Sequence, residues 1–325
     1  MNKNLKFKIL PALFFAVFLL SGCMEEKDIF IPDGNYEFVG NVNSLKNTLA
    51  PNYETYDFEI KDTQDYFQLN QSTYLLAGPD NFVSQNGEAY DGEVTVKLKS
   101  SQNVSEWIGL DFSFQSENGY MDVLFTHKLF FRDGQGHKLE PNKDNPPVLG
   151  IPVDQEIKEA RYFYQTNESV RWTASDEVLQ YTEWEAVNDD GELKTITGYQ
   201  FPLEESSWYA LGQSFDLTPN SRICIQLPEG FTASNTTTYV IFKHYKTIVN
   251  LNEWDAKNQY LACNSRFLIP ANEFVDIVSI SGISGNRYFF DSSVEYVDHD
   301  PEQLFELYPT KRNMNYILTK LNLTD

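Results

Sequence analysis

Cysteine and histidine are scarce in this chain of 325 residues, and their spacing argues against the common metal sites. The sequence has three cysteines, Cys23, Cys224 and Cys263, and four histidines. Zinc sites commonly use close pairs such as His-x3-His or Cys-x2-Cys, and no such pair occurs in the sequence. We therefore expect no metal site.

The motifs of several large enzyme classes are also lacking. No Walker loop and no Gly-x-Gly-x-x-Gly fingerprint is present, so we expect no nucleotide cofactor and no other cofactor. The nearest string to a Gly-x-Ser-x-Gly elbow, Ser281–Gly285, has the wrong spacing and lies between expected strands. Residues 188–192 lack the alternating ligands of a calcium loop. We predict no catalytic residue and no enzymatic activity.

One enzyme class stays open because it has no local motif. Glycoside hydrolases need two carboxylates that converge in space, and a sequence does not show which acids converge. With 47 Asp and Glu residues in the chain, a glycosidase is the enzymatic alternative.

Basic residues are few relative to acidic ones. The 25 Lys and Arg against 47 Asp and Glu give a formal net charge of −22. A chain of this charge repels phosphate backbones unless a basic stripe offsets it, and none is evident in the sequence. We therefore exclude nucleic acid as a partner.

The start of the chain has the features of an export signal. Lys3, Lys6 and Lys8 precede an apolar run from Leu10 to Leu20. This run is too short for a permanent membrane span. We expect residues 1–22 to be a cleaved signal peptide, which takes the formal charge from −22 to −25 because three lysines leave with it.

The residues that follow resemble the lipobox of bacterial lipoproteins. Leu20, Ser21, Gly22 and Cys23 give a branched apolar residue, two small residues and a cysteine. The resemblance implies cleavage before Cys23 and lipid attachment to its sulfur and its new amine, which together anchor a protein stably. The alternative is an ordinary secretory signal with a chance cysteine.

An acidic cluster follows the cysteine. Glu25, Glu26 and Asp28 resemble the signal that sends lipoproteins of the Bacteroidota to the outer face of the outer membrane. The alternative is a solvated acidic tether. We expect a lipid-anchored protein of the outer membrane that faces the cell surface, with residues 23–50 as its tether.

The pattern from 51 to 145 is typical of β-sheet. Apolar and polar residues alternate over 94–98, 108–114 and 121–131, and Asn-Gly or Asp-Gly turns separate the runs. Short alternating strands at this spacing predict an antiparallel sandwich or barrel, and we expect a sandwich.

Proline residues between 141 and 152 suggest a boundary, because proline does not fit a central strand. We predict a second antiparallel sandwich over 146–325, with strands at 223–227, 239–242, 275–277 and 287–290, the last two joined by a hairpin through Gly285-Asn286. The spacing of Met314, Ile317, Leu318 and Leu321 predicts a short C-terminal amphipathic helix, with Thr310 as its N-cap. The predicted fold class is therefore mainly β, with two sandwich-like domains and one short C-terminal helix.

Two passages resemble uncharacterised β-rich surface lipoproteins of the Bacteroidota, whose first domain is ZU5-like. The first passage is Leu75–Val83 with Asn86-Gly87 and Gly92–Val96, and the second comprises Ile223–Phe231, Tyr239–Phe242, Val275–Ile280 and Asn286–Phe290. A Trp-Ile-Asn-Cys-Asp-like patch of those proteins corresponds here to Trp208–Gln213, which lacks the cysteine and the acid. The resemblance implies a ZU5-like first domain and a C-terminal sandwich, and it brings no catalytic residue.

Some side chains keep two interpretations. Cys224 and Cys263 either pair as a disulfide or lie apart as buried thiols. His127 shares a strand face with Phe125 and Leu129, which favours a hydrogen-bonded core histidine. The five tryptophans either stack on sugars or pack in the core: Trp107, Trp172, Trp184, Trp208 and Trp254.

The expected function is that of a lipid-anchored, non-catalytic binding or assembly component of the cell envelope. Its partners would be the membrane through Cys23, and an envelope protein or a polysaccharide. The alternative is a surface glycan-binding lipoprotein, or a glycosidase with paired carboxylates. The identity of the ligand is not encoded in a recognisable motif.

Overall fold

The computed structural model describes residues 42–116, 119–165, 171–187, 191–215, 220–255, 257–258, 261–264, 269–283 and 287–322. These residues all belong to one compact unit, Glu37–Asp325. The predicted leader, Leu20–Cys23 and the acidic residues Glu25, Glu26 and Asp28 lie outside the described residues.

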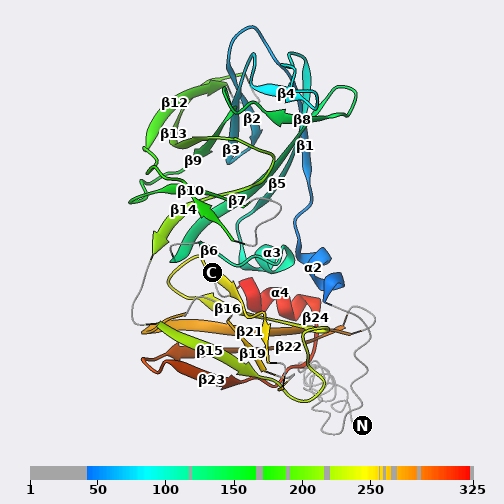
Figure 1. Cartoon of the computed structure of the whole chain (residues 1–325), viewed down its shortest axis with the longest axis vertical. Coiled ribbons are helices and arrows are strands. Elements are labelled where there is room, and N and C mark those ends of the chain that lie inside the picture. Colours follow the sequence, from blue (N-terminus) through cyan, green and yellow to red (C-terminus); the bar gives the residue numbers. More distant parts are fainter. Residues whose placement is uncertain are drawn as a thin grey trace, which may run out of the picture. The chain divides into compact units, whose positions relative to one another are not determined.

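Two β-sheets form the first sandwich (Figure 1). In the larger sheet the strand order is β1 (Glu54–Glu59), β5 (Glu93–Ser101), β7 (Gly119–Asp133), β14 (Trp208–Phe215), β10 (Arg161–Gln165) and β11 (Thr173–Ala174), with β4 (Phe82–Ser84), β6 (Gln115–Ser116) and β8 (Lys138–Pro141) beside this path. In the smaller sheet it is β12 (Thr182–Val187), β13 (Leu193–Pro202), β9 (Val148–Pro152), β3 (Thr73–Ala77) and β2 (Asp65–Asn70). The pairings within both sheets are antiparallel.

Alternation of apolar residues explains how these two sheets pack. Val94, Val96 and Leu98 on β5 are fully buried, while the residues between them are partly or fully exposed. They join a core with Leu75 and Leu149 from the smaller sheet. The alternating pattern predicted for this strand is therefore confirmed, because it is the inward face of a half-buried strand.

The strand pairing does not follow the boundary predicted between residues 145 and 146. β9 pairs with β3, and β14 pairs with β7, so both sheets of the first sandwich extend past this position. The change from one sandwich to the next comes between β14 and β15, which corrects the prediction. Pro146 and Pro147 lie just before β9, so they interrupt the strand pattern without ending the sandwich.

The second sandwich is built from the remaining strands. One sheet contains β18 (Glu253–Trp254), β19 (Leu261–Cys263), β15 (Asn220–Gln226), β20 (Ile269–Pro270) and β23 (Glu302–Glu306). The other has the order β17 (Ile248–Asn250), β16 (Thr236–Phe242), β21 (Glu273–Ile283), β22 (Arg287–Val297) and β24 (Thr310–Asn313). β15 and β23 are parallel, in contrast to the antiparallel pairs of the first sandwich. β16 is buried at each of its seven residues, as its continuous apolar run predicts.

A disulfide joins β15 to β19 and decides between the two interpretations of the cysteines. Cys224 and Cys263 lie directly opposite each other in the ladder, with 4.1 Å between their Cα atoms. Both side chains are buried. The bond therefore closes the loop between two neighbouring strands inside the second sandwich.

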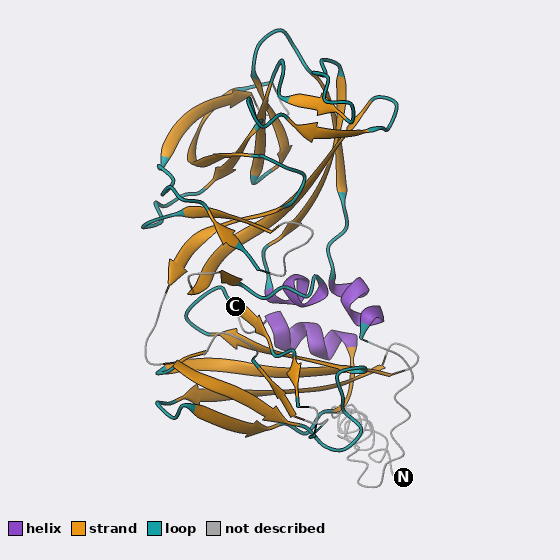
Figure 2. Cartoon of the chain, in the orientation of Figure 1, coloured by secondary structure: helices purple, strands orange, loops and turns teal. Residues whose placement is uncertain are grey.

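The short C-terminal helix is confirmed as α4 (Met314–Asn322), and Figure 2 shows it with α2 (Asn43–Leu49) and α3 (Val104–Gly109). Ile317 and Leu321 are buried, as the predicted stripe requires. Thr310 is not the N-cap because it belongs to β24; the side chain of Asn313 accepts a hydrogen bond from Tyr316 N at 2.8 Å instead.

Helices α2 and α3 correct two further predictions. The predicted tether over 23–50 ends in α2, whose Leu45 and Leu49 are buried in the core. The predicted strand over 108–114 is replaced in part by α3. Asn103 caps this helix by accepting from Glu106 N at 3.0 Å, and Val104, Trp107 and Ile108 form its buried stripe.

One apolar core includes residues from both sandwiches and from the three helices, and a polar junction lies beside it. Asp111 has a left-handed backbone, with φ of 59°. Its Oδ1 accepts from Tyr239 Oη at 2.6 Å and from Asn250 Nδ2 at 2.9 Å, and it lies 2.8 Å from Lys46 Nζ. One carboxylate oxygen therefore connects α2, β16 and β17.

Within the residues described above, none of the helices is both long and apolar enough to cross a membrane.

Candidate ligand-binding pocket

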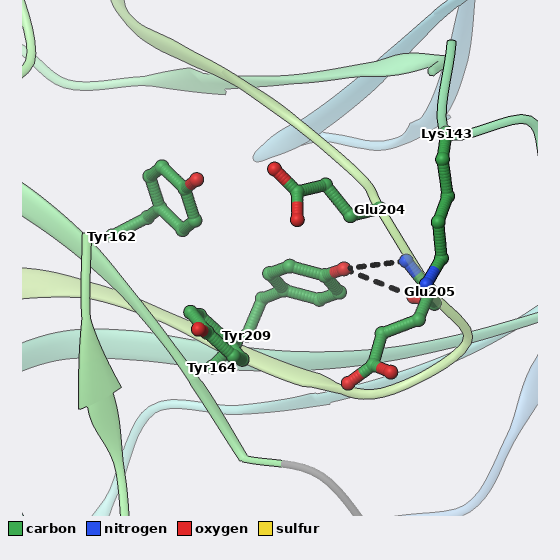
Figure 3. A pocket seen from close by; sticks show the side chains of 6 residues that line it. All are labelled: Lys143, Tyr162, Tyr164, Glu204, Glu205 and Tyr209. Atoms are coloured by element: carbon green, nitrogen blue, oxygen red, sulfur yellow. Dashed lines mark hydrogen bonds between the residues drawn. The ribbon is translucent and has the colours of Figure 1, made fainter. Parts of the chain in front are cut away.

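A small pocket in the first sandwich gathers aromatic and charged side chains from three segments (Figure 3). Its volume is about 100 Å³. The lining residues are Lys143 from the segment between β8 and β9, Tyr162 and Tyr164 from β10, Glu204 and Glu205 from the loop between β13 and β14, and Tyr209 from β14.

The two tyrosines of β10 lie two positions apart, so their side chains are on the same face of the strand. Both line the pocket on that face. Their ring centroids lie 6.4 Å apart. Tyr162 also stacks on Phe201 of β13, with a centroid distance of 5.0 Å and an interplanar angle of 7°. Both tyrosines are half-buried and pack on the core of the first sandwich, so their rings form a supported aromatic wall.

Tyr209 fixes the loop that brings the two glutamates to the pocket. Its hydroxyl accepts from Glu205 N at 3.1 Å and donates to Glu205 O at 3.0 Å, as the dashed lines in Figure 3 show. The Tyr209 ring is buried, and burial raises the pKa of its hydroxyl. At the start of the loop, Leu203 N donates to Pro147 O at 2.9 Å. The glutamates therefore stand on a loop that is held at both of its ends.

One carboxylate oxygen of Glu205 has no partner among the described residues. Its Oε1 is buried and accepts no hydrogen bond from any residue that the structure describes. A buried polar atom without a partner costs about 1–3 kcal/mol, and more when the group is charged. Figure 3 shows Glu204 extending from the same loop towards Tyr162.

The electrostatic surroundings of the pocket are negative. Burial raises the pKa of the Tyr162 hydroxyl, and the negative charges of Glu204, Asp176 and Glu177 raise it further. Arg161 is adjacent in sequence, but its guanidinium donates to the backbone oxygens of Ser175 and Asp176 at 2.5 and 2.7 Å. Lys143 is the cation among the six lining residues, and it is exposed.

A larger cleft of about 540 Å³ lies where α3 and β7 meet the turn between β16 and β17. Three of its polar side chains are engaged by the protein. Lys243 pairs with Asp276, His244 pairs with Glu273, and Asp122 accepts from Lys246 N at 2.8 Å. We take the smaller pocket as the candidate site because it brings two carboxylates to a supported aromatic wall; both hollows contain a buried polar atom without a partner among the described residues, which in the cleft is Trp107 Nε1.

The sequence did not single out the residues of this pocket. Its signals were the alternating Tyr162 and Tyr164 and the adjacent Glu204 and Glu205, which are too common to stand out in a chain of this composition. Across the described ranges, no group of three or more His, Cys, Asp or Glu side chains is placed to hold a metal ion.

The residues discussed from the sequence lie mostly in the core. Trp107, Trp172 and Trp184 are buried, and none of the five tryptophans lines the small pocket. His127 is the buried histidine that its strand position favoured. Its Nδ1 lies 2.9 Å from the Ser100 hydroxyl, and burial lowers its pKa to about 3.

Comparison with known proteins adds no family. No protein-family model and no curated protein matches the sequence. Among solved structures, the Bacillus anthracis TIE protein aligns with 80% of this chain and 58% of its own length, at 8% identity and a TM-score of 0.19. The gamma-CGTase of alkalophilic Bacillus clarkii aligns with 79% of this chain and 41% of its own, at 10% identity and a TM-score of 0.18. The chain thus spans less than two thirds of either protein, and likenesses at these scores carry no argument about fold or activity.

Proposed function

We propose that this protein is a lipid-anchored component of the cell envelope that binds a ligand without catalysis, and that the pocket formed by Tyr162, Tyr164, Glu204, Glu205 and Tyr209 is its ligand site. The observation that supports binding most directly is the meeting of the Glu204 and Glu205 side chains with an aromatic wall in one pocket. Ligand sites combine apolar or aromatic walls with a few polar groups of this kind. The loop held by Tyr209 presents these groups in a fixed geometry.

The proposed localisation rests on the sequence. The lipobox ending at Cys23 and the acids Glu25, Glu26 and Asp28 support attachment to the outer membrane with the protein facing the cell surface. The Cys224–Cys263 disulfide agrees with export, because disulfides persist in oxidising compartments. In this setting the partner is an envelope protein or a polysaccharide.

The localisation is tested by treating intact cells with protease. We expect wild-type protein to be cleaved before lysis, and the Cys23→Ala variant to be lost from the membrane fraction. Full protection of the wild type until cells are lysed would refute the surface location.

The binding site is tested by equilibrium binding of the full mature chain to a panel of envelope polysaccharides and peptides. We expect Tyr162→Ala to weaken binding at least tenfold. Tyr296→Ala is a matched control, because Tyr296 is an exposed tyrosine of β22 in the second sandwich. Equal loss in both variants, or no loss in Tyr162→Ala, would remove the pocket from the proposal.

A glycosidase is the second candidate, and one observation favours it: Glu204 and Glu205 bring two carboxylates to one pocket. Glycoside hydrolysis uses two carboxylates on either side of the scissile bond. The measurement is the release of reducing sugar from the same polysaccharides. Turnover that is abolished by Glu204→Gln and by Glu205→Gln would establish the enzyme, whereas the binding proposal expects no turnover by the wild type.

A further inference from the structure

We propose that the group recognised by this pocket is a cationic amine, such as the ammonium of an amino sugar or of an alkylamine chain. This inference rests on the proposed binding role of the pocket and adds the chemical class of the ligand. It rests on the charge, the aromatic wall, the lining carboxylates and the size of the pocket.

The balance of charge favours a cation. Glu204 and Glu205 line the pocket, and Lys143 is the one cation among its lining residues that the structure describes. Lys143 is exposed and forms no ion pair within 4.0 Å in the parts of the chain that the structure covers. The nearby charges of Asp176 and Glu177 act on Tyr162 with the same sign as Glu204. A neutral ligand would leave this negative field uncompensated, and an anion would be repelled by it.

The aromatic wall favours a cation as well. The faces of Tyr162 and Tyr164 carry the negative part of the ring quadrupole, which attracts an ammonium group within about 6 Å of the ring centroid. The two centroids are 6.4 Å apart, so a small cation placed over the ring faces can lie within this range of both rings. The stacking of Tyr162 on Phe201 keeps the wall in place.

The Glu205 side chain lines the pocket with a carboxylate, and an ammonium supplies three hydrogen-bond donors. A hydrogen bond from an ammonium to the Glu205 carboxylate is charge-assisted and about twice as strong as one from a neutral hydroxyl. The volume of about 100 Å³ is below the 300–1,000 Å³ of sites for drug-sized ligands. The pocket therefore holds one functional group and a few carbons, and the rest of the ligand lies outside it.

The test compares probes of equal size and different charge. Propylamine and propan-1-ol form one pair, and glucosamine and glucose form the other; each pair is titrated into the full mature chain at constant ionic strength and neutral pH. We expect each amine to bind at least tenfold more tightly than its hydroxyl partner, in line with a charge-assisted bond worth about 1.4 kcal/mol more.

Matched variants separate the pocket from the general acidity of the chain. Glu205→Gln keeps the shape of the side chain and removes its charge, and we expect it to abolish the preference for amines. Glu183→Gln removes one exposed charge from β12, outside the pocket, and should leave the preference unchanged. Circular dichroism of both variants confirms that they are folded.

The possible outcomes point to different conclusions. Equal affinity for amine and hydroxyl probes, with both lost in Tyr162→Ala, refutes the amine and retains the binding pocket. Amine binding that Glu183→Gln weakens as much as Glu205→Gln shows non-specific attraction and refutes the inference. No binding of either amine also refutes it. If, in addition, Tyr162→Ala leaves binding to the envelope panel unchanged, the proposed function fails too.

Discussion

The Cys224–Cys263 disulfide allows a prediction whose size follows from the structure. The bond links two neighbouring strands, β15 and β19, across 39 positions of sequence. A cross-link stabilises a protein mainly by reducing the freedom of its unfolded chain, and a loop of this length is worth about 4 kcal/mol at 25 °C. Replacing both cysteines by alanine removes this restraint.

The expected change in melting temperature depends on which part of the chain unfolds together. If the second sandwich unfolds by itself, as a unit of roughly 100 residues, its unfolding entropy near 0.2 kcal/mol/K turns 4 kcal/mol into a fall of about 20 °C. If the two sandwiches unfold as one unit of roughly 280 residues, the same free energy lowers the Tm by about 7 °C. The shared core of both sandwiches favours the second value.

Differential scanning calorimetry of the wild type and of Cys224→Ala/Cys263→Ala measures this directly. A reducing agent provides the matched control, because it should lower the Tm of the wild type and leave that of the double variant unchanged. The reasoning is refuted if the double variant melts at the temperature of the oxidised wild type. It is also refuted if reduction lowers both transitions equally.

Three further predictions concern the core and the junction. Burial lowers the pKa of His127 from 6.5 to about 3, so the unfolded chain takes up a proton on this group before the folded chain does as the pH falls. The free energy of unfolding should therefore be highest above pH 6.5 and fall as the pH drops towards 3. From pH 7 to pH 5 the free energy of unfolding of the wild type should fall by about 2 kcal/mol more than that of His127→Gln, as measured by urea denaturation at each pH. Asp111→Ala removes an acceptor shared by three donors, including the hydroxyl of the buried Tyr239, and should lower the free energy of unfolding by about 2–4 kcal/mol in the same assay. Wild-type stability in this variant would show that the junction at Asp111 does not stabilise the fold. Gly109→Ala places a methyl group against the backbone of Ala50, where α2 meets α3, and should lower the free energy of unfolding by about 1–3 kcal/mol. An unchanged urea midpoint would show that the backbone of Ala50 moves aside without a loss of stability.

Several elements of the fold could be predicted from local patterns. The alternation over 94–98 and 121–131 predicted β5 and β7, and the spacing of Ile317 and Leu321 predicted α4. These predictions succeeded because a strand or a helix that packs one face on a core repeats its apolar residues with its own period. The fold class, mainly antiparallel β-sheet with a short C-terminal helix, followed from them.

Other elements were predicted wrongly where the same residues fit both the strand period and the helix period, or where local sequence does not show which strands pair. The alternating Ile108, Leu110, Phe112 and Phe114 fit a strand, but the Asn103 cap and the spacing from Val104 form a helix first. The prolines near residue 146 predicted a domain boundary, although the strands on either side return to the same sheets. Local sequence does not record which strands pair.

The candidate site was beyond prediction for the same reason. Lys143, Tyr162 and Glu205 belong to separate segments, and the pocket exists because β10 and the loop before β14 fold onto one edge of the first sandwich. The unpartnered oxygen of Glu205 is a property of the surrounding packing. No spacing in the sequence encodes it.

The sequence by itself determined the properties that depend on neighbouring residues: the strand and helix periods, the net charge of −22, and the apolar run that precedes Ser21, Gly22 and Cys23. The tertiary structure decided what depends on contacts between distant residues. It paired Cys224 with Cys263, placed the division between the sandwiches after β14, and assembled the tyrosine and glutamate pocket. The physical reason is that periodicity reports which face of an element is buried, whereas the partner that buries it is chosen by packing across the whole fold.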